Sequence, residues 1–256
     1  MWLPGTTFHR FCNRAATRFT AVDLPGHGAN KKPDSVVTTQ SYIQALVDVI
    51  TPLDHPVILA GHSTNGALIS HVAEQVPEKI ERLIYVTAFL LKNGGSVFEA
   101  MEGDTDAEVF SEIRFSDDQA FATLPIPALL RVGLHDVGHT EIQRILPLMA
   151  EWQASEPFLT RLAVSNENFG SVPKTYIRTN IDKMISPALQ NTMIVNWEVD
   201  SIFDLESGTQ KSTDNVPDNP SYGVQSHPNS VYVLDCPSSI RFPSHQLDEL
   251  YASIRH

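Results

Sequence analysis

The chain has 256 residues, a formal net charge of −12 and an apolar fraction of 42%. This length suits one large α/β domain with an insertion, and an ordinary apolar fraction excludes wholesale disorder. The negative charge and the lack of a dense basic block argue against nucleic acid or an anionic membrane as a partner. The two cysteines, Cys12 and Cys236, argue against a disulfide framework.

Targeting signals are not evident in the sequence. The N-terminal residues lack the basic start and apolar core of a secretory signal, and no segment approaches the ~20 apolar residues of a membrane span. The expected location is therefore the cytoplasm.

The first third of the chain alternates between strand and helix patterns. A strand is expected over residues 19–24, and residues 39–53 carry apolar side chains at helical spacing. Residues 56–60 and 82–89 form short apolar runs, typical of strands buried on both faces, and a helix is expected after Ser63. This alternation predicts a mostly parallel central sheet with helices on both faces and with Ser63 at the edge where such sheets bind ligands.

The middle of the chain interrupts this alternation. Residues 97–165 show helical, acidic patches and no clear buried strand, which predicts a helical cap inserted into a core of residues 1–96 and 166–256. Beyond the cap we expect a strand over residues 174–179 and a helix over residues 187–195. A long polar loop (206–229), a last strand (231–234) and a closing helix (246–254) are expected to follow.

The segment Gly61-His62-Ser63-Thr64-Asn65 lies between a predicted strand and a predicted helix. A serine hydroxyl is a weak nucleophile that needs a base, and a sharp strand-to-helix turn presents it beside the N–H groups of the helix N-terminus. Gly61 allows the turn to close, whereas Asn65 occupies the place of a second small residue and Gly66 follows it. Ser63 is therefore the predicted nucleophile, and a simple helix cap is its alternative role.

Several segments resemble the α/β-hydrolase superfamily, and within it the branch of small esterases, plant methylesterases and hydroxynitrile lyases. Residues with this resemblance are 23–28 (Asp-Leu-Pro-Gly-His-Gly), 56–63, 85–90, 169–177 and 182–190. The resemblance implies an α/β-hydrolase fold. It also implies that Asp182 is the acid that orients a catalytic histidine, although an ordinary turn aspartate is the alternative.

The resemblance further implies a histidine directly after the last strand, and neither matching segment contains one. Residues 204–208 continue with Thr209, and residues 234–237 continue with Ser238.

Three other histidines follow Asp182 and keep the chain order Ser, Asp, His: His227, His245 and His256. We nominate His245, at the start of the closing helix, as the base. A surface histidine is its alternative role.

The remaining candidates are oxyanion donors, a neighbour of the substrate and a pair of possible metal ligands. The backbone N–H of Thr64 is expected to hold the oxyanion together with that of Thr6, and His62 is included as a neighbour of the substrate, with packing as its alternative. His135 and His139 have helical spacing but no obvious third ligand, so no metal is expected.

These residues predict a serine hydrolase that acts on a carboxylic ester or lactone through an acyl-enzyme at Ser63, without a cofactor. One alternative is a catalytically impaired protein of the same fold that binds a small molecule. Another is a hydroxynitrile-lyase-like enzyme, against which the missing histidine counts. The expected partner is a small-molecule ester or lactone, not nucleic acid or membrane, and a homodimer is left open.

Overall fold

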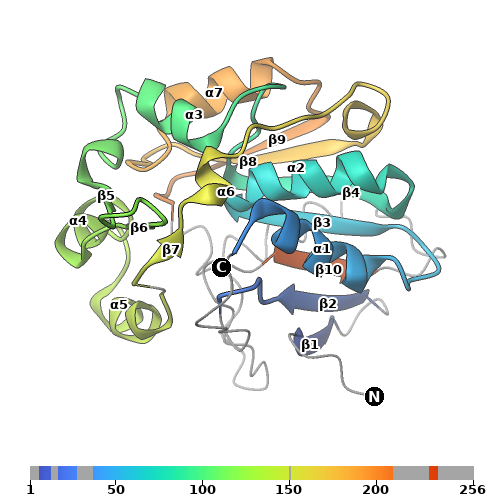
Figure 1. Cartoon of the computed structure of the whole chain (residues 1–256), viewed down its shortest axis with the longest axis horizontal. Helices are drawn as coiled ribbons and strands as arrows, with labels where there is room; N and C mark the ends of the chain where they lie inside the picture. The colour runs from blue at the N-terminus through green and yellow to red at the C-terminus, as the bar shows by residue number, and fades with distance from the viewer. Residues whose placement is uncertain (1–5, 13–16, 28–36, 150, 210–230, 236–256) are drawn as a thin grey trace.

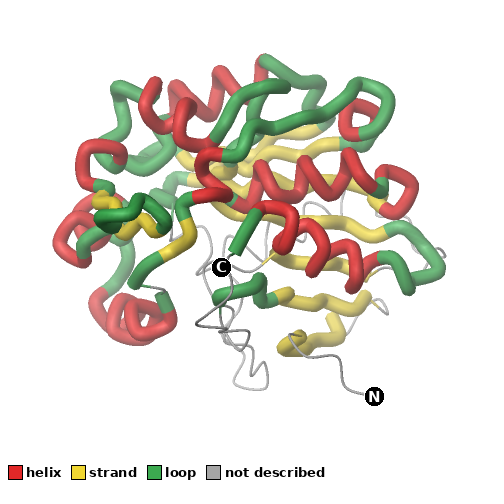
Figure 2. The backbone as a smooth tube through the Cα atoms, viewed as in Figure 1, coloured by secondary structure: helices red, strands yellow, loops and turns green. Residues whose placement is uncertain are grey.

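The computed structural model describes residues 6–12, 17–27, 37–149, 151–209 and 231–235. Its centre is a seven-stranded sheet with the order β1-β2-β10-β3-β4-β8-β9 (Figures 1 and 2). The strands are β1 (Thr6–Cys12), β2 (Thr17–Val22), β3 (Val57–Ser63), β4 (Ile80–Ala88), β8 (Lys174–Thr179), β9 (Ser201–Leu205) and β10 (Val231–Asp235). Strands β2, β3, β4, β8 and β9 run in one direction, and β1 and β10 run against them.

The sheet is buried because its strands carry apolar residues in both alternating sets. Leu59, Leu83 and Tyr85 belong to the larger core cluster, whereas Ile58 and Ile84 belong to a second cluster. Successive side chains of a strand point to opposite faces, so the two clusters lie on the two sides of the sheet. The predicted buried strands over residues 56–60 and 82–89 are thereby confirmed.

Helices α1 (Thr39–Ile50), α2 (Asn65–Gln75) and α7 (Pro187–Val195) add side chains to the larger cluster. Figure 1 shows α1 and α2 side by side in front of β3 and β4. Local sequence fixes where these helices begin: the Thr38 side chain caps α1, and the Ser186 side chain accepts from the Leu189 N–H at the start of α7. The three predicted helices are confirmed.

We use the name cap segment for residues 97–165. It contains short helices and a small antiparallel sheet with the order β5-β6-β7, on the left of Figure 1. Its elements are α3 (Val97–Gly103), η3 (Phe110–Glu112), β5 (Arg114–Phe115), β6 (Phe121–Thr123), α4 (Ile126–Val132), α5 (His139–Ile145), η4 (Leu146–Leu148), β7 (Gln153–Ala154) and α6 (Glu156–Leu159). The three short strands are additional to the helices that the sequence predicts.

Two further 3-10 helices, η2 (Pro77–Lys79) and η5 (Phe169–Ser171), lie beside the sheet. No helix in the described ranges is long and apolar enough to cross a membrane. The predicted closing helix over residues 246–254 and most of the predicted polar loop lie outside the described residues.

Strand β9 forms one edge of the sheet and was not predicted. It pairs with β8 in parallel, from Thr175 with Ser201 to Thr179 with Leu205. Ile202 is 45% exposed, and Asp204 forms an ion pair with Arg178 on the neighbouring strand. A strand with one exposed face and a charged residue lacks the apolar run that identifies the central strands.

The predicted last strand is confirmed as β10, but its position is unexpected. It lies between β2 and β3 and is antiparallel to both, with Tyr232 opposite Ala21 on one side and Ala60 on the other. The His55 imidazole, in the turn before β3, fixes the far end of β10 through its Nε2 atom and the Asp235 carboxylate, while its Nδ1 atom contacts the Asp54 carboxylate at 2.6 Å.

The contacts of His55 predict a pH-dependent stability. Hydrogen bonds to Asp54 and to Asp235 raise the pKa of the His55 imidazole. Its stabilising effect should be complete below the ordinary histidine pKa of about 6.5 and should be lost as pH rises through the higher pKa of the folded protein. Urea unfolding from about pH 6 to about pH 9 measures this loss. His55→Gln should flatten the profile and Asp235→Asn should reduce its slope; an unchanged slope in Asp235→Asn would contradict this position of β10.

Candidate active site

Ser63 is the last residue of β3, and its φ angle is 53°. This left-handed conformation is rare for a residue with a side chain and occurs at strained functional turns. Thr64 then continues directly into α2, and the Ser63 carbonyl oxygen accepts a hydrogen bond of 3.0 Å from the Phe89 N–H. The predicted strand–turn–helix geometry around Ser63 is thus present.

Glycine is required at two positions of this turn. A Cβ atom on Gly61 would lie 2.7 Å from the Asn65 carbonyl oxygen, and a Cβ atom on Gly66 would lie 2.8 Å from both the Ala88 Cβ atom and the Phe89 backbone. The second small residue that the turn needs is therefore Gly66. Asn65 itself is buried, with 6% of its surface exposed.

The groups beside Ser63 are arranged to receive a substrate. Within the described residues, neither the Ser63 hydroxyl nor the Thr64 N–H makes a hydrogen bond to the protein. The Thr64 N–H lies at the N-terminus of the 11-residue helix α2, where N–H groups lack partners within the helix and the helix dipole favours negative charge. Thr64 is therefore suited to hold an oxyanion.

The structure does not bring Thr6 to this position. Thr6 begins the edge strand β1, and strands β2 and β10 separate it from β3. Neighbouring strands are ~4.8 Å apart, so Thr6 is about 14 Å from the β3 strand that carries Ser63. Thr6 is too distant to share an oxyanion with Thr64.

Asp182 follows β8 and is 5% exposed. Its Oδ2 atom accepts from the hydroxyls of Thr87 at 2.6 Å and Thr179 at 2.9 Å. Its Oδ1 atom accepts from the N–H groups of Met184 at 2.8 Å and Ile185 at 3.0 Å, and from the Thr209 hydroxyl. A carboxylate has about four lone-pair sites, so these donors saturate it.

Gln190, on α7, holds the loop that carries Asp182. Its side chain is fully buried, accepts from the Thr179 N–H at 3.0 Å, and donates to the carbonyl oxygens of Thr179 at 3.0 Å and Ile185 at 2.8 Å. Gln190 thus ties the end of β8 to the far side of the Asp182 turn. No sequence motif singled it out, because glutamine is common on helices.

Thr209 occupies the position beside Asp182 where the resemblance implies a histidine. It is fully buried and follows β9, the strand next to β8. Its hydroxyl donates to Asp182, and its carbonyl oxygen accepts from the Nε2 atom of His62 at 3.1 Å. His62 is 4% exposed and therefore lies within the core. Its hydrogen bond to Thr209 holds the segment after β9 in place. His245 lies outside the described residues.

The cap segment also contacts the residues before Thr209. The Gly208 N–H donates to the Asp136 carboxylate at 2.8 Å, and a Cβ atom on Gly208 would lie 2.6 Å from the His135 ring. His135 Nδ1 lies 3.2 Å from the Val132 carbonyl oxygen, so this histidine packs between the cap segment and Gly208. No cluster of three or more potential metal ligands occurs among the residues that the structure describes.

The model of the alpha/beta hydrolase family matches residues 1–213. The match covers most of the chain. The chain belongs to this family, which confirms the resemblance and the predicted fold class. Strand β10 lies beyond the matched residues.

Relatives and solved structures agree with this assignment. Methylesterase 1 from Arabidopsis thaliana is 28% identical over 213 residues, which are 78% of this chain and 79% of the relative. Putative methylesterases 11 and 12, chloroplastic, from the same plant are longer, and the chain spans only 51% and 56% of them. Polyneuridine aldehyde esterase has a TM-score of 0.64 at 21% identity, with 73% of this chain and 79% of the other covered. A pyrethroid hydrolase from Sphingobium faniae has a TM-score of 0.61 at 24% identity, with 73% and 77% covered.

The turn geometry predicts a strong effect of one methyl group. Gly66→Ala should lower the free energy of unfolding by about 1–3 kcal/mol, because the new Cβ forces α2 away from β4. It should also slow labelling of Ser63 by a fluorophosphonate. Gly103→Ala is the matched control, since nothing lies within 4 Å of a Cβ there. Equal stability of the two variants in urea unfolding would refute the close approach at Gly66.

Proposed function

We propose that this protein hydrolyses a carboxylic ester or lactone through an acyl-enzyme at Ser63. The observation that supports this most directly is the left-handed Ser63 between β3 and α2, with the Thr64 N–H beside it. The relatives named as methylesterases and the structural neighbours named as esterases support the same class of reaction. The chain spans only about half the length of some relatives. The site itself is therefore the main support for the proposed activity and substrate.

In this mechanism, the Ser63 oxygen attacks the ester carbonyl carbon while a base accepts its proton. The Thr64 N–H donates to the oxyanion that forms, and the leaving alcohol departs with the proton from the base. Water then attacks the acyl-enzyme, loses its proton to the same base, and releases the acid and the Ser63 hydroxyl. His245 is the base in this proposal, with Asp182 as the acid that orients it.

A second candidate function is ligand binding without turnover. The observation that favours it is the Thr209 hydroxyl on Asp182, because that carboxylate is saturated by donors other than an imidazole. An imidazole could bind Asp182 only by displacing one of these donors. A serine without an oriented base loses most of its nucleophilic assistance.

The proposal also includes the location of the protein, its division into cap and core, and the kind of substrate. We place the protein in the cytoplasm, with residues 97–165 as a cap over a core of residues 1–96 and 166–256. The substrate is a small molecule, and whether the chain forms a homodimer is open.

Two variants test the proposed function. Ser63→Ala should abolish fluorophosphonate labelling and lower kcat/KM for p-nitrophenyl acetate at least thousandfold, and His245→Ala should lower it roughly thousandfold. Ser111→Ala, an exposed serine of the cap segment, is the control and should leave the rate unchanged. Labelling that survives in Ser63→Ala would reject the nucleophile, and no labelling of the unmodified protein would favour ligand binding instead.

A further inference from the structure

A cleft begins one residue beyond the nucleophile. It lies between α1, the first turns of α2 and the cap elements β7 and α6, and it is open to solvent. Thr64 and Asn65, which follow Ser63, form part of its wall. The catalytic groups described above make no use of the rest of this wall.

One wall of the cleft is a single face of α2. Thr64, Ala67, Leu68 and His71 all line it, and their spacing of three, four and seven positions puts them on one side of a helix. His71 is partly buried, and burial lowers the pKa of its imidazole. The ring is therefore neutral at pH 7 and offers one donor and one acceptor. Among the described residues, no group forms a hydrogen bond with it.

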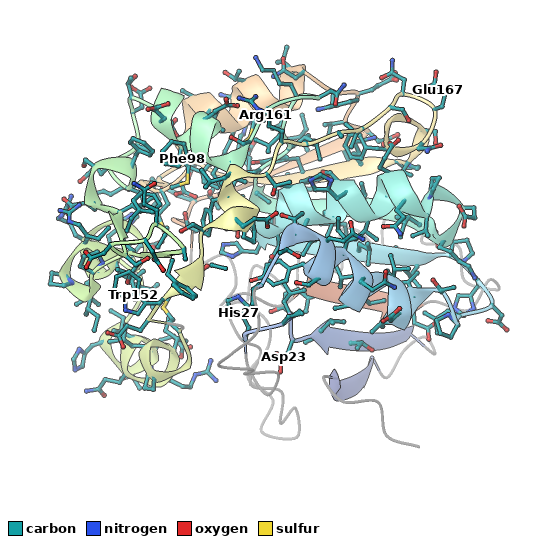
Figure 3. The ribbon with its side chains drawn as sticks, viewed as in Figure 1. Asp23, His27, Phe98, Trp152, Arg161 and Glu167 are labelled. Carbon is teal, nitrogen blue, oxygen red and sulfur yellow. The ribbon has the colours of Figure 1, made fainter. Side chains whose placement is uncertain are left out.

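The core side of the cleft is polar but already internally paired. The Tyr42 hydroxyl lies 2.9 Å from the Nε2 atom of His27. Burial raises the pKa of Tyr42, so its hydroxyl keeps its proton. Figure 3 labels His27 beyond the end of β2, and Trp152 in the cap segment. His71 is the other imidazole of the wall, and it has no hydrogen-bond partner among the described residues.

The charges around the cleft disfavour an anion. The Glu156 carboxylate lies at the N-terminus of α1, where it accepts from the Thr39 N–H at 2.6 Å and from the Thr160 hydroxyl at 2.9 Å. Its negative charge adds to the effect of burial in raising the pKa of Tyr42. At His71 the same charge opposes the larger effect of burial, which lowers the pKa. No lysine or arginine lines the described cleft. A carboxylate ligand would therefore meet a negative charge without a compensating cation.

The rest of the wall combines apolar side chains with the polar residues Thr39, Gln153 and Thr160. Leu24 and Leu68 line the cleft from the core, and Pro157 and Phe158 line it from α6. A cleft that combines apolar side chains with a few polar groups is typical of a site that orients a small neutral ligand.

We propose that this cleft binds the acyl arm of the ester, an uncharged chain with a hydroxyl or carbonyl oxygen near its far end, and that His71 forms the hydrogen bond to that oxygen. This inference rests on the proposed ester hydrolysis at Ser63. Thr64 and His71 are seven positions apart on the helix, so the rise between them is about 10 Å. This length matches an acyl chain of roughly eight carbon atoms. His71 is thus a residue that determines specificity.

Three esters test this assignment through their kcat/KM values. They are p-nitrophenyl 8-hydroxyoctanoate, p-nitrophenyl nonanoate, in which a methyl group replaces the hydroxyl, and the anionic mono-p-nitrophenyl ester of nonanedioic acid. The unmodified protein should prefer the hydroxy ester to the nonanoate by roughly tenfold, and the anionic ester should be slowest. His71→Phe should remove the preference, and His71→Gln should keep part of it. His139→Phe, an exposed histidine of the cap segment, should keep all of it.

An unchanged preference in His71→Phe, or a preference for the anionic ester, would overturn the assignment of the cleft. p-Nitrophenyl acetate is too short to reach His71, so its hydrolysis reports on the proposed function alone. If the acetate is not hydrolysed, calorimetric binding of N-methyl-8-hydroxyoctanamide to Ser63→Ala tests the cleft separately. Roughly tenfold weaker binding after the added substitution His71→Phe would support the cleft, and equal binding would overturn it.

Discussion

The carboxylate of Asp182 is the interaction on which the site depends. Three hydroxyls converge on it from the end of β4, the end of β8 and the segment after β9, and two N–H groups of its own turn complete the set. Hydrogen bonds to a buried charge are stronger than those between neutral groups, and several of these donors would be left unsatisfied without the carboxylate. One side chain thus fixes the relative positions of three strand ends at the edge that carries Ser63.

Donors from the described residues satisfy the Asp182 carboxylate. In a serine hydrolase the acid of the triad orients an imidazole, which would supply a donor to the carboxylate. Among the described residues, Thr209 supplies a donor to Asp182, and His62 holds the Thr209 carbonyl from the core side. The fold therefore keeps a satisfied buried carboxylate whether or not an imidazole contacts it. The close packing of Gly61 and Gly66 shapes the turn at Ser63 in addition.

The sequence predicted the elements whose signal is local. The apolar runs of β3, β4 and β8 and the helical spacing of α1 identify them without knowledge of their neighbours, and the turn after β3 identifies Ser63. Strand β9 was missed because an edge strand with an exposed Ile202 has no continuous apolar run. The position of β10 could not be predicted, since pairing with β2 and β3 depends on contacts between residues far apart in the chain. Thr87, Thr179 and Gln190 escaped notice for the same reason: each is an ordinary residue until the fold brings it to Asp182 or to its turn.

The most direct test of this account is the free energy of unfolding of Asp182→Ala in urea. The account predicts a loss of about 2–4 kcal/mol, because several buried donors lose their common acceptor. Asp106→Ala, at an exposed aspartate of the cap segment, should change it by less than about 0.5 kcal/mol. A change in Asp182→Ala as small as that of the control would contradict the account, since Asp182 would then be an ordinary loop residue.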